Sequence, residues 1–289
     1  MSVTSFGERL ISTFESSGHL CVGIDPHPFL LSEWSLADDA AGLREFGLRV
    51  VEATAGRAGI VKPQVAFFER HGSAGYLALE QVIAAARAAG LLVIADAKRG
   101  DIGTTVEAYG QSWLTPGSPL ESDAMTISAF QGVGSIAAPH ALALAGGKGL
   151  FVLAATSNPE AADLQTATLN GGPSAGRSVA ASIVSEVHDW NALETSAPGS
   201  SPLGSTGVVI GATVALGDYG ITPGALAATP VLAPGFGHQG ARVSDATRLF
   251  GAASVGVIVS ASRSILMAGP ASIAAAIDAQ NAEISGAFA

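Results

Sequence analysis

The chain has 289 residues, of which 48% are hydrophobic and 13% are charged, and its formal net charge is −10. This composition excludes a disordered chain, and the lack of any apolar run of about 18 residues excludes a membrane-spanning helix. The negative charge and the scattered basic residues argue against nucleic acid as a partner; because Glu8 and Arg9 interrupt any signal-peptide core, we expect a cytoplasmic protein.

Short apolar runs alternate with longer segments of helical pattern along the whole chain. Runs this short and this uniformly apolar are typical of parallel strands buried on both faces. In chain order they predict strands at His19–Ile24, Gly59–Lys62, Leu91–Ala95, Asp123–Ile127, Gly149–Ala154, Gly207–Gly211, Pro230–Ala233 and Ser254–Ser260.

The segments between these strands have the spacing of amphipathic helices. The clearest are Ala41–Arg57, Ala74–Ala89, Val179–Trp190 and Ser264–Ala279. Eight strand–helix units in a chain of this length predict an α/β fold, a (β/α)₈ or TIM barrel that forms a single domain over residues 1–289. An open doubly wound sheet is the main alternative. The polar segment Ser196–Gly207 is interpreted as a surface loop, because the alternation resumes after it.

In such a barrel, chemistry belongs at the carboxyl ends of the strands, where the loops converge. Polar residues that could carry chemistry do follow the predicted strands. They are Asp25, Lys62, Asp96 with Lys98, Thr156-Ser157-Asn158, the loop 234–240, and Ser262 with Arg263. The segment Thr156-Ser157-Asn158 is compatible either with a helix N-cap or with groups that bind a polar ring.

Lysine is rare in this chain, where only Lys62, Lys98 and Lys148 occur. A lysine can give up a proton when its pKa is shifted, whereas arginine holds its proton too tightly for acid–base work. If the third strand continues to Lys98, its period of two directs Asp96 and Lys98 to one side. With Lys62 and Asp101 they predict a network of alternating charges. Spacing alone is equally compatible with a surface salt-bridge turn.

Three further features are possible sites: Lys148, the single cysteine and the histidines. Lys148 follows two glycines but lacks the rest of a P-loop, so we interpret it as a solvated loop residue. The single cysteine, Cys21, excludes an internal disulfide, and its apolar surroundings predict a buried thiol. The histidines show no metal-ligand spacing.

The loop after the seventh predicted strand contains a G-x-G-x-x-G pattern at Gly235, Gly237 and Gly240. This pattern occurs in dinucleotide-binding proteins, but here only one strand follows, and it ends in Arg263 instead of leading to an acidic residue. In a barrel, the loops after strands seven and eight commonly bind phosphate. We therefore expect a phosphate monoester held by Gln239 and Arg263, with His238 nearby. A dinucleotide site and a glycine-rich turn without a ligand are the alternatives.

Taken together, these motifs resemble the orotidine 5′-phosphate decarboxylase family, in the form of its longer bacterial branch. The motifs occur in the family's order over nearly the whole chain: Gly23-Ile-Asp-Pro26, Val61-Lys-Pro-Gln64, Asp96-Ala-Lys-Arg-Gly-Asp-Ile-Gly-Thr-Thr105, Thr156-Ser-Asn-Pro159, Ala233-Pro-Gly-Phe-Gly-His-Gln-Gly240 and Ser262-Arg263. The resemblance implies a (β/α)₈ barrel that converts orotidine 5′-monophosphate to UMP and CO₂ without a cofactor or a metal. It also implies a homodimer with shared active sites, in which Asp101, Ile102 and Thr105 reach the partner's site.

The resemblance also implies a role for each matching residue. Asp25 and Lys62 would contact ribose hydroxyls, Asp96 would lie beside the departing carboxylate, and Lys98 would protonate C6 of the pyrimidine. Ser157 would contact the pyrimidine edge, and Gln239 and Arg263 would hold the phosphate. Pro234 and Ser262 complete the substrate-binding set through their motifs. Ser128 lies where the family has a polar residue near the base, although Ala129-Phe130 departs from the more usual Pro-Tyr.

Two other functions remain open at this point. One is a related barrel enzyme that acts on a sugar phosphate and shares Asp-x-Lys-x-x-Asp but uses Mg²⁺. The other is a redox or non-catalytic nucleotide-binding protein built on the Gly235–Gly240 loop.

Overall fold

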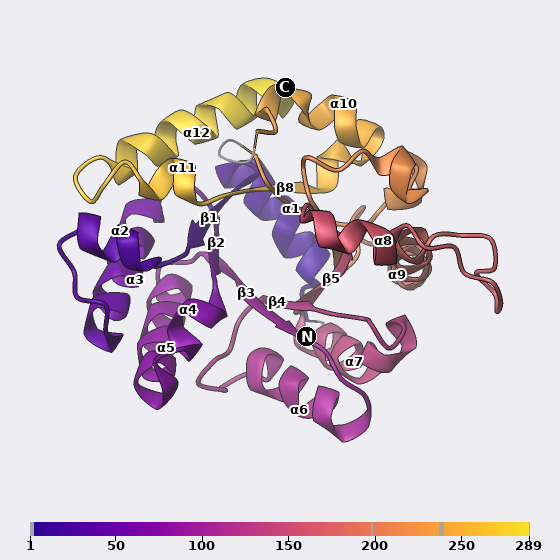
Figure 1. The fold of residues 1–289 in the computed structure, drawn as a ribbon, viewed down its shortest axis with the longest axis horizontal. Helices are drawn as coiled ribbons and strands as arrows, with labels where there is room; N and C mark the ends of the chain where they lie inside the picture. Colours follow the sequence, from indigo (N-terminus) through magenta and orange to yellow (C-terminus); the bar gives the residue numbers. More distant parts are fainter. Residues whose placement is uncertain (1–2, 198, 237–239, 289) are drawn as a thin grey trace.

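The structure, a computed structural model, describes residues 3–197, 199–236 and 240–288. Its eight parallel strands close into a barrel in which each strand pairs with its neighbours in the chain, and the last pairs with the first (Figure 1). The prediction of a single-domain (β/α)₈ barrel is confirmed. The strands are β1 (Leu20–Ile24), β2 (Ile60–Pro63), β3 (Leu92–Arg99), β4 (Ala124–Ile127), β5 (Gly149–Ala155), β6 (Thr206–Ile210), β7 (Val231–Pro234) and β8 (Val257–Ala261).

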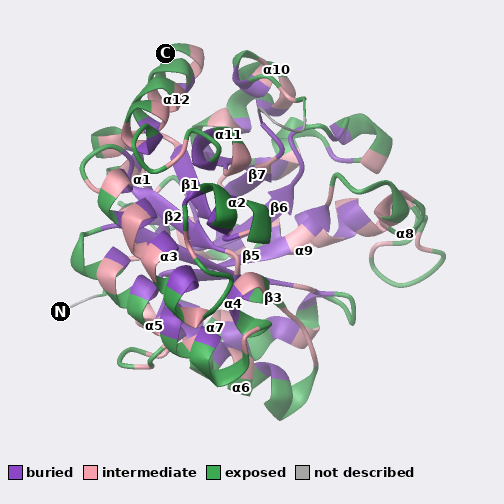
Figure 2. Ribbon diagram, turned by 60° about the vertical axis from the view of Figure 1, so that its left-hand side comes forward, coloured by how far each residue is buried: buried purple, intermediate pink, exposed green. Residues whose placement is uncertain are grey.

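Helices surround the barrel and cover the outer face of its strands, so that the buried residues lie in the centre (Figures 1 and 2). The α-helices are α1 (Phe6–Ser17), α2 (Pro28–Glu33), α3 (Ala40–Thr54), α4 (Val65–Glu69), α5 (Gly72–Ala88), α6 (Gly103–Leu114), α7 (Ala137–Gly146), α8 (Ala162–Gln165), α9 (Val179–Thr195), α10 (Ala246–Phe250), α11 (Arg263–Leu266) and α12 (Ile273–Phe288). Short 3₁₀ helices are η1 (Val133–Ile136), η2 (Pro159–Ala161), η3 (Leu216–Tyr219), η4 (Pro223–Leu226), η5 (Val243–Asp245) and η6 (Gly251–Gly256).

The period of two along each strand divides the core into two layers. One set of strand side chains packs outward against the helices, as Val93 and Ala95 of β3 do. The other set fills the barrel and includes Ile94 of the same strand. Cys21 belongs to this inner layer, where burial raises the pKa of its thiol to about 12, so the prediction of a buried thiol is confirmed.

Helix α1 packs against the same inner layer. Its residues Phe6, Leu10 and Phe14 belong to the cluster that fills the barrel, and the ring of Phe6 meets that of Phe151 edge to face. The helix begins with a capping box, in which the Ser5 hydroxyl accepts from the Glu8 amide and the Glu8 carboxylate accepts from the Ser5 amide. Because the apolar face of α1 closes this end of the barrel, the opposite end is left for a site.

Several element boundaries differ from the predictions, and two of these differences have a clear local cause. The strand expected from Ser254 begins only at Val257, because η6 occupies the three preceding residues. The helix expected over Ser264–Ala279 is divided into α11 and α12. Gly269 between them has φ +76°, and the proline after it cannot donate a backbone hydrogen bond, so the helix cannot continue.

The prediction that Lys148 is solvated is wrong. Its side chain is buried before β5, with Nζ 2.8 Å from Glu121 Oε1 and 3.7 Å from Asp123 Oδ1. Arg9 of α1 pairs with Asp123 as well, and Arg87 pairs with Glu121. The local motif gave no sign of this cluster, because its acidic partners lie in the segment before β4.

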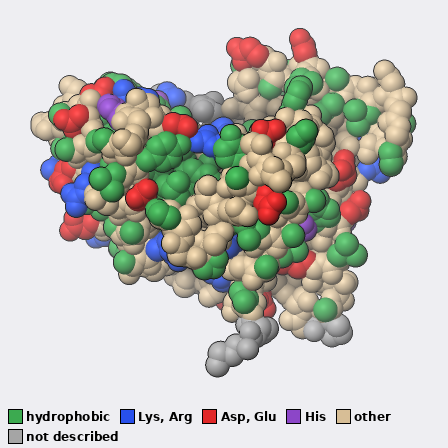
Figure 3. All heavy atoms as spheres, turned by 90° about the horizontal axis from the view of Figure 1, so that it is seen from below, with side chains coloured by type: hydrophobic (Ala, Val, Ile, Leu, Met, Phe, Trp, Pro, Cys, Tyr) green, Lys and Arg blue, Asp and Glu red, His purple; other side chains and the backbone are tan. Residues whose placement is uncertain are grey.

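No helix among the described residues is long and apolar enough to cross a bilayer. On the face shown in Figure 3, Lys and Arg side chains lie among acidic side chains.

We predict that Lys148→Ala lowers the free energy of unfolding by roughly 3 kcal/mol, because it removes a buried counter-charge from two carboxylates. The matched control is Arg87→Ala, which removes a partner of Glu121 whose side chain is 38% exposed, and which should cost less than about 1 kcal/mol. Urea unfolding followed by circular dichroism measures both variants. Equal losses would contradict the prediction.

Candidate active site

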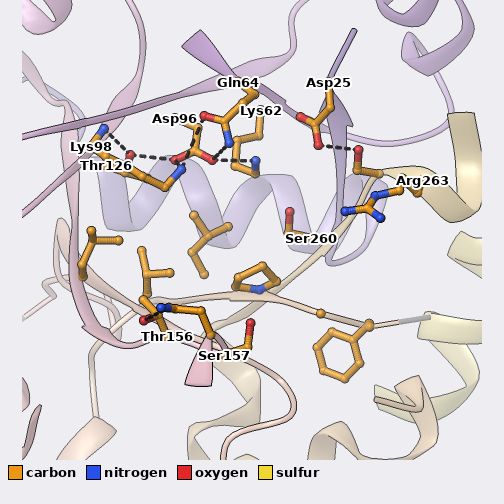
Figure 4. Close-up of a pocket in the computed structure, with 18 of the residues that line it drawn as sticks. Asp25, Lys62, Gln64, Asp96, Lys98, Thr126, Thr156, Ser157, Ser260 and Arg263 are labelled. Carbon is orange, nitrogen blue, oxygen red and sulfur yellow. Dashed lines mark hydrogen bonds and ion pairs between the residues drawn. The ribbon is translucent and has the colours of Figure 1, made fainter. Parts of the chain in front are cut away.

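The carboxyl ends of the strands surround a pocket of about 410 Å³. Polar and charged side chains of this pocket come from β2, β3, β4 and β8 and from the residues that follow β1, β2, β5 and β8 (Figure 4). They include Asp25, Lys62, Gln64, Asp96, Lys98, Thr126, Thr156, Ser157, Ser260, Ser262 and Arg263. Apolar side chains complete the wall: Phe67, Leu153, Val209, Leu232, Pro234 and Phe236.

Strand periodicity explains why these polar side chains meet. Ile60 and Ile94 belong to the apolar filling of the barrel, and two residues later on the same strands stand Lys62 and Asp96. Because successive side chains alternate between the faces of a strand, both point into the barrel one layer above. Thr126 reaches this layer in the same way from β4. The polar wall is therefore the last inner layer of the barrel.

The Asp96 carboxylate is the centre of this layer. The ammonium of Lys62 and the amide of Gln64 each donate to its Oδ2 at 3.0 Å. The ammonium of Lys98 donates to Oδ1 at 2.6 Å, and the Thr126 hydroxyl donates to the same oxygen at 2.9 Å. Four donors thus surround one carboxylate, and the predicted contacts among Lys62, Asp96 and Lys98 are present (Figure 4).

Burial and opposite charges set the protonation of this cluster. Burial by itself would lower the pKa of Lys62, but the charges of Asp96 and Asp25 outweigh it and raise that pKa. Burial by itself would raise the pKa of Asp96, but the ammonium groups of Lys62 and Lys98 hold that pKa well below its usual value. At neutral pH Asp96 is therefore an anion and Lys62 a cation. The Lys98 side chain is 46% exposed, against 8% for Lys62, and so faces the open pocket.

The other end of the pocket carries Asp25 and Arg263, well separated from Lys98 in Figure 4. The Ser262 hydroxyl donates to Asp25 Oδ2 at 2.6 Å, whereas the buried Oδ1 has no hydrogen-bond partner among the described residues. Gly23 permits this approach, since a Cβ there would lie 2.8 Å from the Cβ of Ser262. The geometry leaves one carboxylate oxygen available to a ligand hydroxyl.

Across the pocket from this polar wall lies the turn after β5 (Figure 4). Gln165 of α8 holds it by accepting from the Thr156 amide at 2.9 Å and donating to the Thr156 hydroxyl at 3.0 Å. Asn158 stands at the start of η2 but makes no side-chain cap there. Of the two interpretations of this segment, its place in the pocket with the exposed Ser157 favours contact with a ligand.

The structure of one chain does not bring Asp101, Ile102 and Thr105 into the pocket. The Asp101 carboxylate accepts from the amide of Ile102 and contacts neither Lys98 nor Lys62. Ile102 is 59% exposed, and Thr105 is exposed in the first turn of α6. With the partly buried Asp101 they form a segment that begins shortly after β3 and is mostly exposed.

Three other predicted residues do not appear in the described pocket. Ser128 lines a second, mostly apolar cavity of about 400 Å³ with Phe130, and Leu153 lines both this cavity and the described pocket. Gln239 and His238 lie outside the described residues. In the part of the chain that the structure describes, no group of three His, Cys, Asp or Glu side chains is arranged as a metal site.

Gln64 and Thr126 both bind Asp96, and neither was predicted from the sequence to be a site residue. Gln64 was visible within the Lys-Pro-Gln motif, directly after the lysine strand. Thr126 was visible as a polar residue near the carboxyl end of the fourth predicted strand. His27 also lines the pocket, where burial lowers the pKa of its imidazole.

Comparisons with known proteins agree with this geometry. The model of a family described as "Orotidine 5'-phosphate decarboxylase / HUMPS family" matches residues 18–277, which include the described pocket. A protein named orotidine 5′-phosphate decarboxylase from Salinispora arenicola is 49% identical, and the alignment covers 95% of this chain and 95% of that protein. A protein of the same name from a Nocardioides species is 50% identical, over 90% of this chain and 91% of that protein. A crystal structure from Streptomyces avermitilis, for which the same name is proposed, is 45% identical with a TM-score of 0.91, covering 99% of this chain and 97% of that one.

The lowered pKa of Asp96 predicts a specific dependence of stability on pH. A carboxylate whose pKa is lowered by folding stabilises the native state above its ordinary pKa of about 3.9 and loses that contribution as the pH falls below it. The difference in unfolding free energy between wild type and Asp96→Asn should therefore shrink from about pH 5 to about pH 2. Urea unfolding at each pH measures it. A difference that stays constant would contradict the lowered pKa.

Proposed function

The chain belongs to the orotidine 5′-phosphate decarboxylase / HUMPS family, and we propose that it converts orotidine 5′-monophosphate to UMP and CO₂ without a cofactor or a metal. The observation that carries this proposal is the Lys98 ammonium, half exposed in the pocket and held at 2.6 Å by a buried anion. Such a group can both attract negative charge that develops on a substrate and deliver a proton to it.

The proposed reaction breaks the bond between C6 of the pyrimidine and its carboxylate. The electron pair stays on C6 and CO₂ leaves; Lys98 Nζ then gives a proton to C6 and later regains one from solvent. The barrier is large because the ring delocalises the C6 electron pair poorly. A fixed ammonium lowers that barrier, since it is already oriented before the charge appears.

Asp96 and Lys62 would prepare Lys98 for this step. Asp96 holds the Lys98 ammonium by a charge-assisted hydrogen bond, and the buried Lys62 compensates the carboxylate from its other oxygen. Asp96 would lie beside the departing carboxylate of the substrate. With Asp101 of a second subunit, the three residues would form a Lys-Asp-Lys-Asp network.

The opposite end of the pocket would bind the ribose phosphate. The Asp25 oxygen that lacks a partner among the described residues fits a ribose hydroxyl, and Lys62 would contact a second one. The planar guanidinium of Arg263 would hold phosphate oxygens in two parallel hydrogen bonds, assisted by Gln239. Pro234 and Ser262 would line this subsite. Across the pocket, Ser157 would bind the edge of the pyrimidine, and Ser128 would act near the base.

We further propose that the active enzyme is a homodimer whose two sites are shared. The support is that Asp101, Ile102 and Thr105 lie outside their own chain's pocket, and that Ile102 exposes an apolar side chain beside the catalytic strand. A second copy would cover this segment and receive Asp101 next to its Lys98.

Two observations favour this function over the Mg²⁺-dependent sugar-phosphate alternative. The relatives that are 49% and 50% identical are named as the decarboxylase. In addition, each Asp96 oxygen already accepts two hydrogen bonds from the chain, which uses the lone pairs that a metal ion would need. The same relatives favour the decarboxylase over the nucleotide redox alternative.

We predict that the protein decreases the absorbance of orotidine 5′-monophosphate, and that the rate is the same with and without EDTA. Lys98→Ala should lower kcat by at least ~1,000-fold, because it removes both the oriented charge and the proton donor. Its free energy of unfolding should fall by no more than about 1 kcal/mol, since the side chain is half exposed and Lys62 still compensates Asp96. A stable Lys98→Ala variant with near-normal kcat would refute the role of Lys98, and loss of activity in EDTA would refute the cofactor-free reaction.

Shared sites predict complementation between two inactive variants. Mixing Lys98→Ala with Asp101→Ala would give heterodimers in which one site carries both substitutions and the other carries neither. After random exchange of subunits, roughly one quarter of wild-type activity should return, because half of the dimers are mixed and each has one intact site. The control is either variant alone at the same total concentration. No recovery in a mixture shown to contain heterodimers would rule out shared sites.

A further inference from the structure

Strand β3 carries an irregularity where it passes Thr126. Ala95 pairs with Met125, but the next pair joins Arg99 to Ile127. Three residues of β3 therefore face the single residue Thr126 of β4. Irregularities of this kind re-aim side chains and are frequent beside active sites. Here the irregular stretch consists of Asp96, Ala97 and Lys98, so it contains both halves of the central ion pair.

The Thr126 hydroxyl joins the two ends of this stretch. Its oxygen accepts from the backbone amide of Lys98 at 2.9 Å, and it lies 2.9 Å from Asp96 Oδ1. An amide can only donate, and a hydroxyl has one proton, so the proton of Thr126 is committed to the carboxylate. Thr126 is 1% exposed, and a buried site of this kind gives water little access to replace either bond.

The backbone conformation of Lys98 is unfavourable without an interaction that holds it, such as the hydrogen bond to Thr126. Its φ is +46°, in the left-handed region that residues with a Cβ occupy only when their surroundings hold them. The ammonium at the far end of the same residue returns to Asp96 Oδ1, the oxygen that Thr126 also binds. The Lys98 ammonium therefore binds Asp96 Oδ1 directly, and the Lys98 backbone amide is linked to the same oxygen through the Thr126 hydroxyl.

From this geometry we infer that Thr126 is a positioning residue for Lys98. Its hydroxyl connects the left-handed backbone of Lys98 to the Asp96 carboxylate and thereby fixes the position of the ammonium in the pocket. Its consequence for catalysis rests on the proposed function, in which Lys98 delivers a proton to the substrate. A displacement of about 1 Å in a reacting group can lower a rate on the order of 100-fold.

The first test compares Thr126→Val with Thr126→Ser. Valine keeps the shape of threonine but removes both hydrogen bonds, so kcat should fall between ~10- and ~100-fold with little change in KM. Serine keeps the hydroxyl and should recover most of the lost kcat. A role confined to packing predicts the reverse order, because serine loses the methyl group that valine retains.

The second test does not depend on activity. The chain has only three lysines, so ¹⁵N-lysine labelling of the whole protein gives three backbone amide signals, and the Lys98→Ala variant identifies that of Lys98. The Lys98 amide should exchange slowly with solvent in wild type and in Thr126→Ser, and at least ~10-fold faster in Thr126→Val. The amides of Lys62 and Lys148 serve as internal controls and should not change.

The outcomes separate the two proposals. Wild-type kcat in Thr126→Val, or a Lys98 amide that exchanges equally fast in all three proteins, would overturn the positioning role. A wild-type protein that leaves orotidine 5′-monophosphate unchanged would overturn the proposed function. In that case the amide exchange alone would still decide whether Thr126 holds the turn.

Discussion

The rest of this site depends on one constraint: the carboxylate of Asp96 is charged but almost completely buried. Asp96 lies in the uppermost inner layer of an otherwise apolar barrel, where an unpaired charge would cost several kcal/mol. Lys62, Gln64, Lys98 and Thr126 supply its four donors, and they come from β2, the residue after it, β3 and β4. Three adjacent strands must therefore hold their relative positions for the charge to be tolerated. The same requirement keeps Lys98 in a defined place.

Both ends of the barrel contain a buried lysine paired with carboxylates, but the two clusters differ in their access to a ligand. At the end near α1, Lys148 is enclosed with Glu121 and Asp123, and all three residues are buried. At the other end, Lys62 is enclosed in the same way, but Asp96 extends the network to the half-exposed Lys98. The difference is access: one cluster is closed by packing, whereas the other ends in a group that a ligand can reach.

The pocket suits a substrate in which the group that the protein binds lies away from the atom that reacts. Arg263 and Asp25 stand at one end and Lys98 at the other (Figure 4). Contacts to a phosphate and a ribose do not act on the bond that breaks, but their binding energy can align the ring against Lys98. In the proposed reaction, Arg263 and Asp25 therefore bind one end of the nucleotide, and Lys98 presents its charge to the other end.

The amino-acid sequence alone determined the barrel, the end of it that carries chemistry, and the common direction of Asp96 and Lys98. It could do so because hydrophobic periodicity and strand ends are local properties. Only the tertiary structure decided that Lys148 is buried, that Asp101 stays outside its own chain's pocket, and that Thr126 binds both Asp96 and the Lys98 backbone. Each of these depends on a partner far along the chain or on an irregular pairing of β3 with β4, and no periodicity within one segment records such a contact.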